Sequence, residues 1–243
     1  MTALATLTGI VVSAVVAAIL TVYFEIWTTS GDAPGTRGLS AQSETWWDVE
    51  RDARVVRATS TEADRTAWSF RQADAWGDMD AMVAGGGLHA GGLRVRVTLM
   101  NFSKAPAVIT SVRAKVLRER AIPAGPVFRC GGPQGGVAVS RIRMNLGSAD
   151  RAAVEYDEEK VLGQYPTQQI QLSKQDEPAI FDIEIRAGRV AYDFAIEVRY
   201  TQGRHKETML VDDSGKPFTL APDVDERAPA YRCSVNEGVW TRS

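Results

Sequence analysis

LRVRVTLM, residues 93–100, is the stretch that decides the fold. Its apolar residues alternate with arginine and threonine at a period of two, which is typical of a strand with one buried face. The turn NFSKAP at 101–106 follows, and AVITSVRAKVLRE at 107–119 offers a second alternating apolar face. The pattern therefore predicts a long, half-buried antiparallel β-hairpin.

Strand-like runs recur toward the C-terminus, each after a turn signal, at 137–146, 168–172, 180–186, 191–200 and 207–211. FDIEIR and YDFAIEVRY within them alternate strictly, whereas the polar stretch between 148 and 166 predicts a long surface loop or a short helix. About seven or eight antiparallel strands with few helices predict an immunoglobulin-like antiparallel β-sandwich over residues 93–221.

The region before the sandwich, residues 44–92, is rich in aromatic residues. AWGDMDAMVAG at 75–85 has the apolar spacing of a helix, and GGGLHAGG at 85–92 has the composition of a flexible hinge. We expect a small α/β preface that packs on the sandwich and ends in this Gly-rich hinge.

The N-terminus carries a long apolar run, ALATLTGIVVSAVVAAILTVYF at 3–24, without an ionisable side chain. As a helix it measures about 33 Å, enough to cross a hydrocarbon core of about 30 Å. A cleavable signal peptide would have a basic start, a shorter core and small residues at its end, and this chain has none of these. The run predicts an uncleaved single-pass transmembrane helix at 1–27, followed by a flexible linker at 28–43.

The orientation of this anchor is indicated by few charges. The α-amine lies on one side, and Glu25 and Asp32 lie on the other, which favours an extracytoplasmic body.

The chain has two cysteines, Cys130 and Cys233. A disulfide between them would tie the C-terminal tail, 222–243, back to the main body and fits an exported protein, whereas two unrelated buried thiols are the alternative. A cytoplasm-facing sensor or effector is the alternative placement.

Small residues recur along one face of the predicted anchor. Gly9, Ser13 and Ala17 are four apart, which is the pattern that lets two membrane helices approach closely. A homodimer through this face is a hypothesis, and ordinary small residues of a membrane helix are the alternative.

Charge and motifs exclude several function classes. The net charge of −2 gives no overall basic excess for nucleic acid. His89 and His205 have no partners at metal-ligand spacing, so we expect solvated loop histidines, no metal and no cofactor. Asp78 and Asp80 beside Trp76 are the best carboxylate pair for a cell-wall carbohydrate hydrolase, although solvated acids and a buried tryptophan are the simpler interpretation.

Loops of a β-sandwich commonly carry its binding residues. The loops at 131–136 and 148–164 are therefore the candidate interaction sites, and their candidate residues are Gly131, Gly132, Gln134, Asp157, Glu158 and Glu159.

Three short features carry a resemblance to known proteins: Asn101, AVIT at 107–110 and VDDSGKPF at 211–218. With them, residues 93–220 resemble a group of actinobacterial membrane-anchored proteins with a C-terminal β-sandwich domain and no assigned activity. The resemblance implies an N-terminal membrane helix and a β-sandwich, and no catalytic residue.

These observations predict a single-pass protein of the cell membrane whose extracytoplasmic β-sandwich is a binding or scaffolding module of the cell envelope, and not an enzyme. The expected partner is a protein or a cell-wall glycan.

Overall fold

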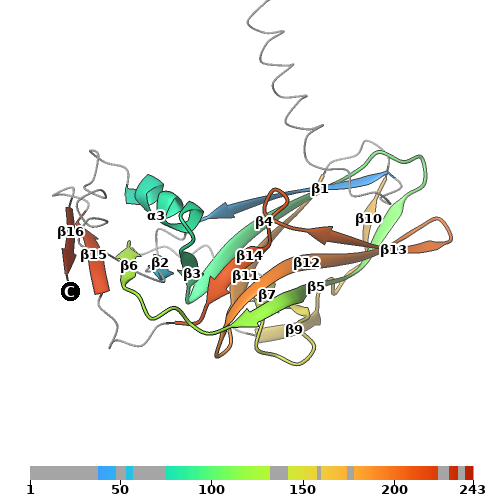
Figure 1. Cartoon of the computed structure of the whole chain (residues 1–243). Helices are drawn as coiled ribbons and strands as arrows, with labels where there is room; N and C mark the ends of the chain where they lie inside the picture. Colours follow the sequence, from blue (N-terminus) through green and yellow to red (C-terminus); the bar gives the residue numbers. More distant parts are fainter. Residues whose placement is uncertain are drawn as a thin grey trace, which may run out of the picture. The chain divides into compact units, whose positions relative to one another are not determined.

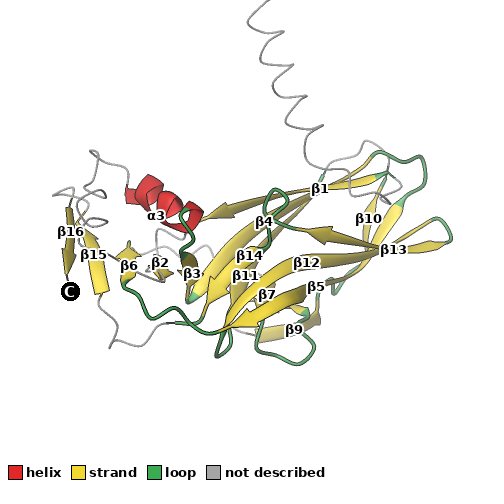
Figure 2. Ribbon diagram, viewed as in Figure 1, coloured by secondary structure: helices red, strands yellow, loops and turns green. Residues whose placement is uncertain are grey.

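A computed structural model describes residues 38–47, 53–56, 75–131, 142–157, 160–173, 178–223, 230–234 and 239–242 (Figure 1). They belong to one compact unit, Gly38–Ser243. The described residues of this unit are mainly β, with strands in two sheets and one short helix, α3 (Ala75–Ala84). Figure 2 colours these strands yellow and the helix red. The predicted β-rich, sandwich-like fold is confirmed.

The predicted anchor at 1–27, with Gly9, Ser13 and Ala17, lies outside the described residues. Within the described residues, no helix has the length and apolar character needed to cross a membrane.

Among the described residues, the first sheet, sheet A, has six strands. In spatial order they are β1 (Leu39–Trp46), β4 (Gly92–Asn101), β11 (Ala179–Arg186), β7 (Ile142–Asn145), β8 (Ala153–Asp157) and β9 (Lys160–Gln164). Neighbouring strands are antiparallel except β11 and β7, which run parallel.

In the part of the chain that the structure describes, the second sheet, sheet B, has ten strands and continues from the sandwich to residues 239–242. In spatial order they are β10 (Ile170–Leu172), β5 (Ala107–Arg120), β12 (Ala191–Gln202), β14 (Phe218–Ala221), β3 (Leu88–Ala90), β2 (Ala53–Val56), β6 (Val127–Cys130), β15 (Ala230–Ser234) and β16 (Val239–Arg242), with β13 (His205–Val211) also paired to β12. β14 and β3 are parallel, and so are β15 and β6. The prediction of an antiparallel sandwich over residues 93–221 was therefore wrong for β11 and β7, whereas the other two parallel pairs each involve a strand outside that range.

The alternating stretches at 93–100 and 107–119 do form strands, but they do not form a hairpin. β4 pairs with β1 and β11 in sheet A, whereas β5 pairs with β12 and β10 in sheet B. The turn between them crosses from one sheet to the other, so their apolar faces meet across the core. Two strands with one apolar face each can bury it in either arrangement, which is why alternation alone did not separate the two.

The core lies between the inward faces of the two sheets. Val95, Val97 and Leu99 of β4 are fully buried. They belong to a cluster that also contains the large buried side chains Phe181, Ile183, Ile185, Phe194, Ile196 and Tyr200. The residues between them on each strand point outward and form the two outer faces of the sandwich.

Asn101 closes the turn that joins the two sheets. Its Nδ2 donates to the carbonyl oxygens of Ala105 and Leu172, both at 2.9 Å. Its Oδ1 accepts from the backbone N–H of Ser103 at 3.0 Å and from Nε2 of Gln202 at 3.1 Å. Because Asn101 and Gln202 are buried, this network fixes the ends of β4, β5, β10 and β12 together.

Three sequence predictions differ from the structure near the strand boundaries. Residues 39–43, predicted as linker, form the first part of β1, because Leu39 is buried and pairs opposite Asn101 on β4. Residues 88–90 of the predicted hinge form β3, which is buried along its length. The polar stretch at 148–166, predicted as a loop or helix, contains β8 and β9.

Candidate functional site

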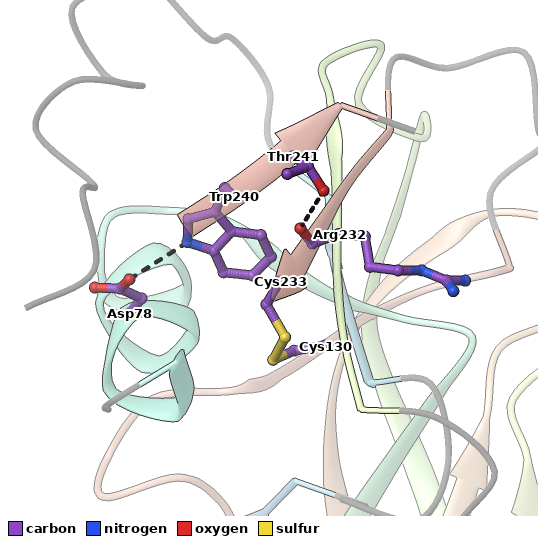
Figure 3. Close-up of a disulfide and its surroundings, with 6 residues drawn as sticks. All are labelled: Asp78, Cys130, Arg232, Cys233, Trp240 and Thr241. Carbon is purple, nitrogen blue, oxygen red and sulfur yellow. Dashed lines mark hydrogen bonds between the residues drawn. A yellow bond between two sulfur atoms is a disulfide. The ribbon is translucent and has the colours of Figure 1, made fainter. Parts of the chain in front are cut away.

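Cys130 and Cys233 form a disulfide, as predicted (Figure 3). Cys130 ends β6, and Cys233 lies on β15, the strand paired in parallel beside it. The bond joins residues 103 positions apart and secures the C-terminal hairpin of β15 and β16 at the end of sheet B. Its first role is therefore structural.

Aromatic side chains pack around this disulfide. Phe128 stacks on Tyr231 with ring centroids 5.1 Å apart, and Trp240 contacts Phe128 edge to face at 5.3 Å. Trp47 stacks on Trp76 at 6.3 Å. These rings surround a small second core that also contains Val55, Met79 and Met82. Trp47, Trp76 and Trp240 are each partly buried against this core. This favours the packing interpretation of the tryptophans over a carbohydrate-binding one.

Asp78 and Asp80 are separated by their bonds to these tryptophans. Trp240 Nε1 donates to Asp78 Oδ2 at 3.3 Å, and Trp47 Nε1 donates to Asp80 Oδ1 at 2.6 Å. Figure 3 shows the first of these bonds. Residues two apart on a helix do not face each other. The two carboxylates therefore anchor different indoles and do not converge on one position between them.

His89 was predicted to be a solvated loop residue, and this was wrong. It lies on β3 and is buried against Trp47, with ring centroids 4.5 Å apart. Burial lowers the pKa of His89 from 6.5 to about 4, because the charged imidazolium would lose its hydration. His205 begins β13 and is exposed, as expected. No group of three metal-ligating side chains occurs within the described residues.

The predicted interaction loops are described only in part. Gly131 directly follows β6 and has a φ of 90°, a conformation that glycine adopts readily. Asp157 is exposed at the end of β8, opposite Lys160 of β9. The remaining predicted residues, Gly132, Gln134, Glu158 and Glu159, lie outside the described residues.

A more developed surface lies on the outer face of sheet A. Five residues of β1, β4, β7 and β8 define it, and we name them the arginine–aromatic face: Trp46, Arg94, Arg96, Arg143 and Tyr156. Arg94 lies opposite Trp46 on one side and opposite Glu184 on the other, and Arg143 also lies opposite Glu184. The face therefore runs across the middle of the sheet.

Carboxylates of β11 hold these arginines in place. Arg96 donates through Nε and Nη2 to the two oxygens of Asp182, at 2.8 and 3.0 Å, and its guanidinium lies 5.1 Å above the ring of Trp46. The hydrogen bond to Asp182 raises the pKa of Arg96 further. A two-point bond plus stacking restricts the side chain, so that less freedom is lost when a partner binds.

Arg143 is oriented in the same way. Its guanidinium lies 4.5 Å above the ring of Tyr156, and its Nε lies 3.4 Å from a carboxylate oxygen of Glu184. Glu184 is buried on the outer face and also pairs with Arg186 at 2.7 Å. A buried acid beneath two arginines restricts both side chains, and it holds the guanidinium of Arg143 beside the ring of Tyr156.

Sequence reasoning missed this face although its signal was present. The outward positions of LRVRVTLM carry Arg94 and Arg96, and those of FDIEIR carry Asp182 and Glu184. The register that brings Arg96 to Asp182 and Arg94 to Glu184 is a property of the sheet and not of either stretch, so neither stretch alone predicts these pairs.

Comparisons with known proteins add no family to this description. No protein-family model matches the chain, and no curated protein is significantly similar to it.

Proposed function

We propose that this chain is a single-pass, membrane-anchored β-sandwich protein whose extracytoplasmic body binds a protein partner through the arginine–aromatic face. Its class is a binding or scaffolding module of the cell envelope. The arginine–aromatic face is the observation that carries the proposal, because Trp, Tyr and Arg are the residues that most often dominate binding energy at protein interfaces. The immunoglobulin-like character of the sandwich and the resemblance to actinobacterial membrane-anchored proteins belong to the same proposal.

The fixed positions of the arginine side chains in the unbound arginine–aromatic face support a role in binding. Arg96 and Arg143 are each held by a carboxylate and an aromatic ring before any partner arrives. Ile180, on the outer side of β11 two residues from Asp182, is 56% exposed and adds apolar area near Arg96. An apolar residue among oriented arginines and aromatics is the composition of an interface centre.

The disulfide supports the extracytoplasmic placement. Bonds of this kind form and persist in oxidising compartments and are rare where cellular thiols are kept reduced. With the apolar run at 3–24, the Cys130–Cys233 bond favours a body on the outer side of the membrane. Labelling of a cysteine introduced at exposed Lys216, in the turn between β13 and β14, in intact cells tests the orientation, and exclusion of an impermeant reagent from this site would favour the cytoplasm-facing sensor.

Affinity capture from envelope extracts tests the binding face. Trp46→Ala combined with Arg96→Ala should abolish recovery of a partner that the unchanged chain captures. Arg204→Ala with Lys216→Ala, in two exposed turns between strands of sheet B, is the control and should capture normally. Equal recovery by both variants would exclude this face as the binding site.

A further inference from the structure

The outer face of sheet B carries a local excess of positive charge. Phe194, Ile196, Val198 and Tyr200 of β12 point into the core, so the residues between them point outward. Cross-strand register extends this outward face to β5 and β13. Its charged residues are the cations Arg113, Lys115, Arg118, Arg120, Arg199 and Lys206 and the acids Asp193 and Glu197. We name this set the basic face.

Each acid of the basic face is covered by two arginines. Asp193 lies 2.6 Å from Nη2 of both Arg118 and Arg120. Glu197 lies 2.8 Å from Nε of Arg199 and 3.8 Å from Nε of Arg113. The side chain of Asp193 is only 6% exposed, whereas that of Arg118 is 66% exposed. The acids are thus beneath the arginines, and the solvent meets the positive groups.

The charge of this face contrasts with that of the whole chain. Six cations against two acids leave an excess of four positive charges, although the chain as a whole carries −2. Lys115 lies on β5 between the two arginine clusters, opposite Ala195. Positive charge is therefore continuous from Arg113 to Arg120 and complements an anionic surface.

Two leucines project from the same face. Leu117 sits at the irregularity in the pairing of β5 with β12 and is 52% exposed. Leu210 on β13 lies opposite Glu197 and is 42% exposed. Basic side chains around exposed aliphatic ones are typical of surfaces that lie on a lipid bilayer, where charge meets headgroups and apolar side chains enter the interface.

The chain also brings this face within reach of a membrane. Gly38, where the described chain begins, lies against Ser103, and Gln202 at the end of β12 bonds to Asn101 in the same turn. The chain therefore enters the sandwich at the end that holds the β12–β13 turn and Lys206. Residues 28–37 of the predicted linker span at most about 36 Å when fully extended.

We propose that the basic face lies against anionic lipid headgroups of the membrane that holds the predicted anchor. This inference rests on the proposed anchored module, and it assigns the two outer faces different roles. Sheet B contacts the bilayer, and the arginine–aromatic face of sheet A stays open for a protein partner.

Lysine acetylation of the full chain in lipid nanodiscs tests this contact. The probes are neutral phosphatidylcholine discs and discs with about one third phosphatidylglycerol, and the labelling rates of Lys115 and Lys206 are read by mass spectrometry relative to Lys160 of sheet A. In anionic discs at about 0.05 M salt, both lysines should react at least about threefold more slowly than in neutral discs, and about 0.5 M salt should restore their rates.

A charge-matched pair of variants isolates the basic face. Arg118→Gln with Arg199→Gln leaves each acid one arginine, Arg120 or Arg113, and should abolish the protection of Lys115. Arg96→Gln with Arg186→Gln removes the same charge from sheet A. This variant should still show the protection of Lys115 in anionic discs. The Cys130–Cys233 bond on a non-reducing gel verifies that each variant is folded.

Three results would overturn the contact. They are equal labelling in neutral and anionic discs, protection that survives in the Arg118 and Arg199 variant, and equal protection by soluble polyphosphate added to neutral discs. Failure of the full chain to be retained in neutral discs would instead overturn the anchored module, so the two failures are distinguishable.

Discussion

Replacing Asn101 with alanine should destabilise the sandwich more than any other single change at the turn between the sheets. The substitution removes two hydrogen bonds that Asn101 donates, to Ala105 and Leu172, and two that it accepts, from Ser103 and Gln202. Gln202 keeps a second acceptor, the carbonyl oxygen of Ala105 at 3.3 Å. The buried carbonyl of Leu172 loses its side-chain donor.

The magnitude follows from these four bonds. At about 1 kcal/mol of net stability for each bond, with an additional cost for a buried group left without a partner, the loss is about 3–5 kcal/mol. For a domain of this size, that lowers the melting temperature by roughly 6–20 °C.

The assay is thermal unfolding of the full chain in detergent, followed by far-ultraviolet circular dichroism and repeated with urea. Ser103→Ala is the matched control, since it removes only the Ser103 Oγ bond to the N–H of Ala105 and should cost less than about 1 kcal/mol. If Asn101→Ala melts within error of Ser103→Ala, the network does not hold the two sheets together and the reasoning is refuted.

Three further predictions concern other parts of the chain. Cys130→Ser with Cys233→Ser should lower the free energy of unfolding by up to about 4.7 kcal/mol in the chain-entropy model. Amide hydrogen exchange should increase first in β15 and β16. Unchanged exchange in these two strands would contradict the structural role of the bond. His89 is neutral when folded, with a pKa of about 4, but binds a proton below 6.5 when unfolded. Stability should therefore be full above pH 6.5 and fall by up to about 3 kcal/mol as the pH drops to 4, and His89→Gln should flatten this slope in urea unfolding. Phe181→Ala should cost about 3–5 kcal/mol because Phe181 is fully buried and contacts Tyr165 edge to face, and a loss below 1 kcal/mol in the same assay would place Phe181 outside the core.

Alternation of side chains predicted most strands but not their partners. The period of two at 93–100 placed Val95, Val97 and Leu99 correctly in the core. The same pattern did not show that β4 and β5 enter different sheets, because this depends on which other strands cover their edges. The parallel pairing of β15 with β6 joins residues about as far apart as the disulfide does, and no local signal encodes such a pair.

The candidate sites were less predictable than the fold. The pairing of Cys130 with Cys233 followed from an even cysteine count and an exported-looking N-terminus, and it was confirmed. The burial of His89 and the bonds of Asp78 and Asp80 to tryptophans depend on contacts between distant segments. Both outer faces depend on such contacts as well, since Arg96 meets Asp182, and Arg118 meets Asp193, only through sheet register.

The path of sheet B has a consequence for synthesis and export. β2, β3 and β6 are synthesised before their distant partners. β3 pairs with β14, and β6 pairs with β15 near the C-terminus as well as with β2. Strands that close only after distant residues emerge fold slowly, and their unpaired edges are exposed meanwhile. Nearly the entire chain must leave the ribosome, and the translocation channel if it is exported, before this sheet is complete, so the nascent protein depends on protection from aggregation until its last strands arrive.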